Sequence, residues 1–362
     1  MASSQILKGC LDELREITRT EFCLQDTAGK IVVCTQFGQP QPETIVSAFA
    51  ESAVDSQIIG TSFLLKVMDD ETVSFVLTAS GSGDNTFMVA RMAVSELQHV
   101  SAAYKERYDR HNFFQDLLLD NLLLVDVASR ARKLHISDQV SRAVILFKVG
   151  TANHEIARQT LSGLFTTQNG DYLTEVEQGS LILIKQMKTK GDNYATLDEV
   201  AETAVDMLNM EAMIKAIAAY GTVIHELKDL SKSFKEAKMA MDVGRIFYAD
   251  RTVISYNRLG IGRLVYQLPR NLCRIFIREI FGEDESAAFD PEVTTTVSTF
   301  FENNLNVSET ARKLFIHRNT LVYRIEKLEK QTGLDVRRFD DALTLKVALM
   351  VCSYIKYIES QE

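Results

Sequence analysis

The sequence contains few residues that interrupt or cross-link a chain, with only four prolines and five cysteines among 362 residues. So few prolines, in a chain that is 46% apolar, indicate ordered globular structure. The cysteines lie far apart and form no CxxC pair, so the sequence indicates neither a disulfide framework nor a zinc site. We therefore expect the thiols, at positions 10, 23, 34, 273 and 352, to be reduced and buried.

Segments that would direct the chain to a membrane are also lacking. The N-terminus does not show the basic and then apolar pattern of a signal peptide. The most apolar run, residues 117–128, is interrupted by Asp120, Asn121 and Asp126, which argues against a membrane-spanning helix. These absences predict a cytoplasmic protein with no membrane partner.

The common motifs of enzyme sites are missing as well. There is no GxxxxGK phosphate loop and no GxSxG nucleophile turn. His154-Glu155 and His225-Glu226 each lack the second histidine that a zinc-binding helix needs, so we expect solvated or core histidines there. The sequence thus predicts no catalytic residue, no cofactor and no metal ligand.

A chain of 362 residues is too long for one ordinary core, and we expect three domains, at residues 1–110, 111–258 and 259–362. In the first, helical and extended patterns alternate, and a long helical stretch then runs from residue 85 to about residue 124. The expected strands are residues 21–25, 30–35, 62–68 and 72–79, and the expected short helices are residues 6–18 and 43–53.

This order of elements resembles the topology of PAS and GAF sensor domains. The resemblance implies a pocket for a small-molecule effector between the sheet and the helix after Pro42, although the sequence identifies no ligand-binding residue. The alternative is that the same residues only pack a dimerisation domain. The long helix is a candidate for pairing with its copy in a second subunit, so we expect a homodimer or a higher homo-oligomer.

The middle domain alternates strand and helix. The expected strands are residues 143–149, 172–176, 181–186, 216–220 and 253–256, and the expected helices are residues 155–165, 197–210 and 231–247. This order implies one antiparallel sheet with helices on a face, which makes the whole chain an α+β protein.

The most informative segment, residues 307–333, predicts two short helices joined by a tight turn. In the first, Val307, Ala311 and Leu314 recur at helical spacing, and Asn306 or Ser308 can cap its start. The second helix begins after His317 and ends near Gly333. It carries its own apolar stripe at helical spacing, formed by Leu321, Ile325 and Leu328.

The second helix also has a selectively basic face. Thr320, Tyr323, Arg324 and Lys327 fall together at about 100° per residue, while Glu326 and Glu329 point elsewhere. The i,i+3 cations Arg324 and Lys327 repel each other mildly. A solvated helix face is one explanation, and contact with the phosphates or guanine edges of DNA is another.

These residues carry a family resemblance. Residues 306–314, the HRNTL block at 317–321, Tyr323-Arg324-Ile325 and Gly333-Leu334-Asp335 resemble the C-terminal helix-turn-helix of PucR/CdaR-type bacterial transcriptional regulators and, more distantly, the Fis-like helix-turn-helix. The resemblance implies a recognition helix at residues 318–330 in the major groove of operator DNA. Its expected DNA contacts are Arg318, Asn319, Thr320, Tyr323, Arg324 and Lys327.

The middle domain resembles the GGDEF-like domain of the same regulators. A nucleotide cyclase of that fold needs two glycines at a hairpin tip and carboxylates that hold metal ions. Here the tip, residues 176–180, contains one glycine, Gly179, and one carboxylate, Glu177. The first strand offers no metal-binding aspartate. We therefore expect a catalytically inactive domain in which Glu177 is a surface residue of the hairpin.

The formal net charge of −9 at first argues against a nucleic-acid partner. Between residues 291 and 338, however, eight Lys and Arg stand against six Asp and Glu, so the candidate DNA-binding segment is locally basic. The sequence as a whole favours a transcriptional regulator that binds double-stranded operator DNA. The alternatives are a divergent nucleotide cyclase or phosphodiesterase, and an interaction scaffold whose helix-turn-helix only mediates assembly.

Overall fold

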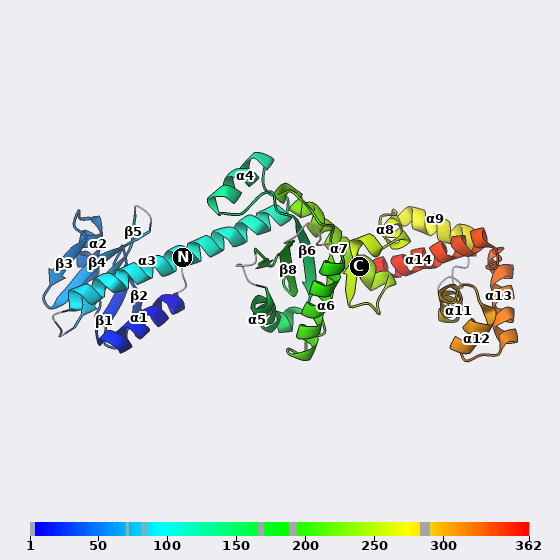
Figure 1. Cartoon of the computed structure of the whole chain (residues 1–362), viewed down its shortest axis with the longest axis horizontal. Coiled ribbons are helices and arrows are strands. Elements are labelled where there is room, and N and C mark those ends of the chain that lie inside the picture. Colours follow the sequence, from blue (N-terminus) through cyan, green and yellow to red (C-terminus); the bar gives the residue numbers. More distant parts are fainter. Residues whose placement is uncertain are drawn as a thin grey trace. The chain divides into compact units, whose positions relative to one another are not determined.

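The computed structural model describes residues 4–69, 72–81, 83, 85–165, 170–187, 194–282 and 290–361. The chain divides into two compact units, Met1–Phe114 and Gln115–Glu362 (Figure 1). Both units combine helices with a five-stranded sheet, which confirms the predicted α+β class. No helix in the described ranges is both long and apolar enough to cross a membrane.

The first unit is an antiparallel sheet with the strand order β2-β1-β5-β4-β3. Its elements are α1 (Ser4–Thr18), β1 (Glu21–Asp26), β2 (Ile31–Cys34), α2 (Glu43–Glu51), β3 (Ser56–Ile59), β4 (Ser62–Asp69), β5 (Thr72–Ser80) and the start of α3 (Thr86–Leu118). The sequence did not predict β3, because this short edge strand is mostly exposed and lacks an apolar alternation. The other elements are confirmed, and the sheet is consistent with a PAS/GAF-like domain.

Helices cover both faces of this sheet. Buried side chains of α1 and α3, including Leu11 and Leu97, pack on one face. On the other face, Val46 and Phe49 of α2 pack against strand residues Leu64 and Val76, between the helix and the sheet where the PAS/GAF resemblance implied a pocket. A small cavity of about 120 Å³ lies elsewhere. It is lined by Val67, Met68, Asp69, Ser74, Phe75, Ser101 and Lys105.

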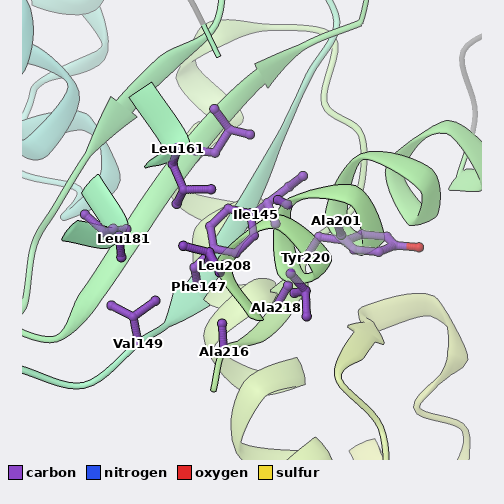
Figure 2. Close-up of a cluster of buried hydrophobic side chains, with 14 of the residues drawn as sticks. Ile145, Phe147, Val149, Leu161, Leu181, Ala201, Leu208, Ala216, Ala218 and Tyr220 are labelled. Atoms are coloured by element: carbon purple, nitrogen blue, oxygen red, sulfur yellow. The ribbon is translucent and has the colours of Figure 1, made fainter. Parts of the chain in front are cut away.

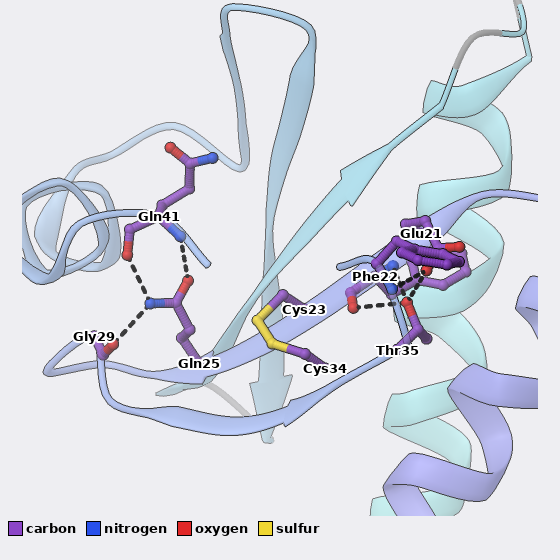
Figure 3. Close-up of a disulfide and its surroundings, with 9 residues drawn as sticks. Glu21, Phe22, Cys23, Gln25, Gly29, Cys34, Thr35 and Gln41 are labelled. Atoms are coloured by element: carbon purple, nitrogen blue, oxygen red, sulfur yellow. Dashed lines mark hydrogen bonds between the residues drawn. A yellow bond between two sulfur atoms is a disulfide. The ribbon is translucent and has the colours of Figure 1, made fainter. Parts of the chain in front are cut away.

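A disulfide joins Cys23 of β1 to Cys34 of β2 (Figure 3). The two residues are direct partners in the antiparallel register, with their Cα atoms 4.0 Å apart. The expectation of reduced thiols is therefore wrong for this pair, because hairpin pairing brings together two cysteines that show no motif in the sequence. The disulfide does not include Cys10, Cys273 or Cys352, and the last two are buried as expected.

Reducing this disulfide should destabilise the β1–β2 hairpin by about 2–3 kcal/mol, because the bond closes a short loop in the unfolded chain. Hydrogen exchange of the β1 and β2 amides, measured on the whole protein with and without a dithiol reductant, would report the loss as faster exchange. A Cys23→Ser/Cys34→Ser variant should exchange equally fast under both conditions. If the reductant did not change the exchange rates of these amides in the unaltered protein, the prediction would be contradicted.

The second unit contains a mixed sheet with the strand order β10-β9-β6-β8-β7. Its first elements are α4 (Leu124–Lys133), β6 (Arg142–Lys148), α5 (His154–Leu164), β7 (Tyr172–Thr174), β8 (Ser180–Gln186), α6 (Tyr194–Met210), β9 (Ile217–Tyr220), α7 (Leu230–Phe247) and β10 (Val253–Ser255). Among the described residues, single-turn 3-10 helices occupy Thr151–Asn153, Leu227–Asp229 and Tyr256–Arg258. The prediction of a wholly antiparallel sheet is wrong, because β10 pairs parallel to β9. The helix α7 between these strands supplies the long crossover that parallel neighbours require.

Helices cover both faces of this sheet, whereas the sequence predicted helices on only one face. Figure 2 shows the first face, where Ile145 and Phe147 of β6 lie among side chains of α5 and α6 such as Leu161 and Leu208. The alternate β6 residue Val144 is buried as well, and its backbone N–H donates to the hydroxyl of Ser233 in α7. The helix α7 therefore covers the second face.

The long helix predicted from residue 85 to about residue 124 is shorter in the structure. The helix α3 ends at Leu118, and α4 begins at Leu124. Asp120 lies between them in the left-handed region, with φ 64°. Its carboxylate accepts hydrogen bonds from Lys235 Nζ at 2.8 Å and Ser231 Oγ at 3.2 Å, which ties the break to α7.

The remaining described elements of the second unit are helices that share a hydrophobic core. They are α8 (Ile261–Tyr266), α9 (Arg270–Phe281), α11 (Pro291–Glu302), α12 (Val307–Lys313), α13 (Arg318–Thr332) and α14 (Phe339–Gln361). Buried residues of α14, such as Leu345 and Cys352, belong to the same cluster as Leu321 and Ile325 of α13. The last helix is therefore buried against the helix-turn-helix.

Candidate nucleic-acid interface

The helix α12 begins and ends where the sequence predicts. The side-chain oxygen of Asn306 accepts hydrogen bonds from the backbone N–H groups of Ser308 and Glu309, both at 3.1 Å, and so caps the helix. Ala311 is buried, and Val307 and Leu314 pack against the same core. The predicted apolar stripe therefore holds α12 in place.

The helix α13 follows after a short turn. Its N-cap is His317, whose Nδ1 accepts a hydrogen bond from the backbone N–H of Asn319 at 3.3 Å. It ends at Gly333, which has the left-handed conformation of a C-cap residue, with φ 73°. The predicted stripe of Leu321, Ile325 and Leu328 is buried. The structure thus contains the predicted helix-turn-helix.

Five of the six predicted DNA contacts lie on the exposed surface of α13, and they are Arg318, Asn319, Thr320, Tyr323 and Lys327. The sixth, Arg324, is half-buried, and its side chain is 27% exposed. Its position explains this difference, because it lies three residues after Leu321 and four before Leu328 on the helix and so borders the buried stripe.

Arg324 is also paired within the domain. One guanidinium nitrogen lies 2.6 Å from a carboxylate oxygen of Glu292 in α11, and another donates to the hydroxyl of Thr296 at 3.2 Å. The charge pattern of α13 alone could not show this pair, because the acidic partner comes from an earlier helix. Any contact between Arg324 and DNA must therefore compete with Glu292.

The cations around the helix-turn-helix fall into two groups. Arg312 forms an ion pair with Glu309, and Arg337 forms ion pairs with Glu329 and Asp335. Arg338 forms an ion pair with Asp341. The hydrogen bond from Arg312 lowers the pKa of Glu309, which keeps that carboxylate ionised. By contrast, Lys313, Arg318, Lys327 and Lys330 have no ion-pair partner among the described residues.

These four side chains, which we call the unpaired cations, are all exposed. Two of them, Lys313 and Lys330, were not among the predicted contacts. Lys330 lies one turn after Lys327 on the same helix, so helical periodicity could have identified it. Lys313 lies at the end of α12, and only the observation that it lacks a partner distinguishes it from Arg312. Because of the unpaired cations, this surface carries positive charge that can contact DNA phosphates.

The hairpin tip of the middle sheet offers a weaker candidate site. The Glu177 carboxylate lies 2.6 Å from Lys238 Nζ of α7, and the hydrogen bond from Lys238 lowers its pKa. Gly179 has a φ of 79°, and an added Cβ would lie 3.0 Å from the backbone nitrogen of Thr151. In the described part of the chain, no group of three or more His, Cys, Asp or Glu side chains is arranged to hold a metal ion.

Two stretches of the chain match known domain families. Residues 293–351 match the PucR C-terminal helix-turn-helix domain, and residues 121–243 match the GGDEF-like domain. The first range contains α12 and α13 and begins one residue after Glu292, and the second contains β6 to β9.

Whole proteins with related sequences include two regulators. The chain is 25% identical to the purine catabolism regulatory protein of Bacillus subtilis over 172 residues, which cover 47% of this chain and 32% of that protein. It is 20% identical to the carbohydrate diacid regulator of Escherichia coli over 277 residues, which cover 74% and 72% of the two chains. The chain thus spans about a third of the first relative and most of the second.

A solved structure is also similar in part. It is the regulator of polyketide synthase expression from Bifidobacterium adolescentis, with 16% sequence identity and a TM-score of 0.34. The similarity covers 67% of this chain and 97% of that chain.

Proposed function

We propose that this chain, which belongs to the PucR/CdaR-type regulators through its helix-turn-helix and GGDEF-like domains, is a sequence-specific DNA-binding transcriptional regulator that responds to a small metabolite. The observation that carries the proposal is the exposed surface of α13, where Arg318, Lys327 and Lys330 have no ion-pair partner among the described residues. A capped helix of 15 residues, braced by a buried stripe, is the shape that enters a major groove.

In this mechanism α13 is the recognition helix, and its residues divide by position. Arg318 and Thr320, near the helix N-terminus, contact phosphate, where the backbone N–H groups also favour an anion. Asn319 and Arg324 contact base edges, to which amide and guanidinium groups can form bidentate hydrogen bonds. Tyr323 and Lys327 complete the face. Arg324 exchanges the Glu292 carboxylate for DNA when the complex forms.

The remaining domains set how two such helices are presented. We propose three domains, at residues 1–110, 111–258 and 259–362, in a cytoplasmic homodimer or higher homo-oligomer. An effector bound by the first domain would change the spacing of two recognition helices, and only one spacing suits two operator half-sites. The names of the relatives support a metabolic effector, since they refer to purine catabolism and to carbohydrate diacids. The middle domain acts in this scheme without catalysis.

The test begins with duplexes selected from random-sequence DNA by the full-length protein. An Arg324→Ala variant should bind the selected duplex more weakly by about 1–3 kcal/mol, the value of a bidentate base contact, and should lose discrimination at one base position. Fluorescence anisotropy with the selected duplex and with single-base variants of it would measure both effects.

Glu292→Gln is the matched control. It removes the ion pair with Arg324 but leaves the guanidinium in place. If Arg324 binds DNA, this variant should bind at least as tightly as the unaltered protein, because a competing carboxylate has been removed. If Arg324 only ties α13 to α11, both variants should weaken binding alike, and the assignment of Arg324 as a DNA contact is then wrong.

A further inference from the structure

Phe315, in the turn between α12 and α13, is the most exposed large apolar side chain among the described residues, at 97%. Its backbone has φ 54°, in the left-handed region. Its N–H donates to the carbonyl of Arg312 at 3.1 Å, and the N–H of Ile316 donates to the carbonyl of Ala311 at 3.0 Å. These two hydrogen bonds close α12 with a Schellman motif in which Phe315 occupies the position that favours glycine.

The fold gains nothing from a phenylalanine at this position. A side chain in the left-handed conformation costs about 1–2 kcal/mol relative to glycine. The ring recovers none of this by burial, and it forms no ring or cation contact with any residue that the structure describes. The following residue, Ile316, already supplies the apolar contact with the core that accompanies this motif. Folding alone would favour glycine or asparagine here.

The surroundings of Phe315 point to one kind of partner. It lies two residues after Lys313 and three before Arg318, which are two of the unpaired cations. It also precedes Ile316 and His317, the N-cap of the recognition helix. In a helix-turn-helix complex this part of the chain passes from the DNA backbone to the groove. An apolar ring between free cations is complementary to a duplex, which presents thymine methyl groups and deoxyribose beside its phosphates.

We propose that Phe315 is a DNA-contacting residue whose ring packs against the apolar surface of the duplex at the entry of the recognition helix. This inference rests on the proposed DNA-binding function and extends it to a residue outside the predicted contacts. It makes Phe315 a position where folding and binding favour different residues. Substitution of Phe315 should therefore raise the stability of the fold and lower the affinity for DNA.

Phe315→Asn and Phe315→Gly test this opposition, because both residues tolerate the left-handed conformation. Each should raise the Tm of the helical domain, and each should weaken binding to the selected duplex about tenfold, as expected for apolar area left in water. Met213→Asn is the matched control. Met213 also has φ 54° and is 89% exposed, but it follows α6 in the middle domain. Its replacement should leave DNA affinity unchanged.

A selected duplex with uracil in place of thymine identifies the apolar group. If the ring contacts a thymine methyl, the unaltered protein loses affinity on this duplex and the difference from Phe315→Asn disappears. If it contacts deoxyribose, the difference persists. Unchanged affinity of both Phe315 variants for the thymine duplex would overturn the proposal. If the unaltered protein itself shows no salt-dependent DNA binding, the proposed function fails instead.

Discussion

Replacing Lys313, Arg318, Lys327 and Lys330 together by glutamine is expected to weaken binding to the selected duplex by at least 100-fold near physiological salt. Each cation that contacts phosphate releases condensed counterions, and each contributes about −0.9 to the slope of log affinity against log salt concentration. These side chains have no intramolecular partner among the described residues, so their charge is available to DNA. Losing up to four contacts should make the slope shallower by up to about 3.6.

A salt titration of the binding constant would measure this slope directly. Because the four side chains are exposed and unpaired in the described structure, each glutamine should change the free energy of unfolding by no more than about 0.5 kcal/mol. The comparison variant replaces Arg312, Arg337 and Arg338 by glutamine. These arginines already face carboxylates, so the slope should change less for them. An unaltered slope in the fourfold variant would remove the basis for a DNA interface on α13.

Gly221→Ala is expected to destabilise the middle sheet by about 3 kcal/mol or more. An added Cβ would lie 2.0 Å from the carbonyl oxygen of Ser233, and this oxygen belongs to the backbone of α7 rather than to a flexible side chain. The helix would have to move away from β6 and β9. That movement would break the hydrogen bonds from Val144 N to Ser233 Oγ at 3.1 Å and from Ser233 Oγ to the Thr222 carbonyl at 2.8 Å. Overpacking and the loss of buried hydrogen bonds both act in this direction.

Hydrogen exchange of the β6 and β9 amides in the full-length protein would show the effect as faster exchange. The control is Gly163→Ala in α5, where an added Cβ would meet no described atom within 4 Å outside its chain neighbours and the backbone of its own helix. This helical alanine should stabilise the domain by about 0.5–1 kcal/mol. If the β6 and β9 amides of the Gly221→Ala variant exchanged as slowly as those of the unaltered protein, the inference that α7 packs closely against the sheet would be wrong.

The helix-turn-helix could be predicted from the sequence almost to the residue. Its apolar stripes, the Asn306 cap and the Gly333 stop are all local signals, and local signals determine where a short helix begins and ends. The same holds for most strands of both sheets, whose patterns lie within a few residues. The edge strand β3 and the break before α4 escaped prediction, because neither shows a strong apolar period.

The features that were missed depend on residues far apart in the chain. The Cys23–Cys34 disulfide follows from hairpin register, and the parallel pairing of β10 follows from the path of α7. The Arg324–Glu292 pair follows from the packing of α11 on α13. None of these leaves a periodic or motif signal in its own segment.

The sequence by itself determined the type and bounds of the main elements and the basic character of α13, since periodicity and capping act over one or two helical turns. Only the tertiary structure decided which cations are free. Arg324 and Lys327 carry the same charge and were both predicted on the basic face of α13, yet a carboxylate from another helix neutralises Arg324 and leaves Lys327 exposed. An ion pair depends on distance in space, and packing rather than chain order sets that distance.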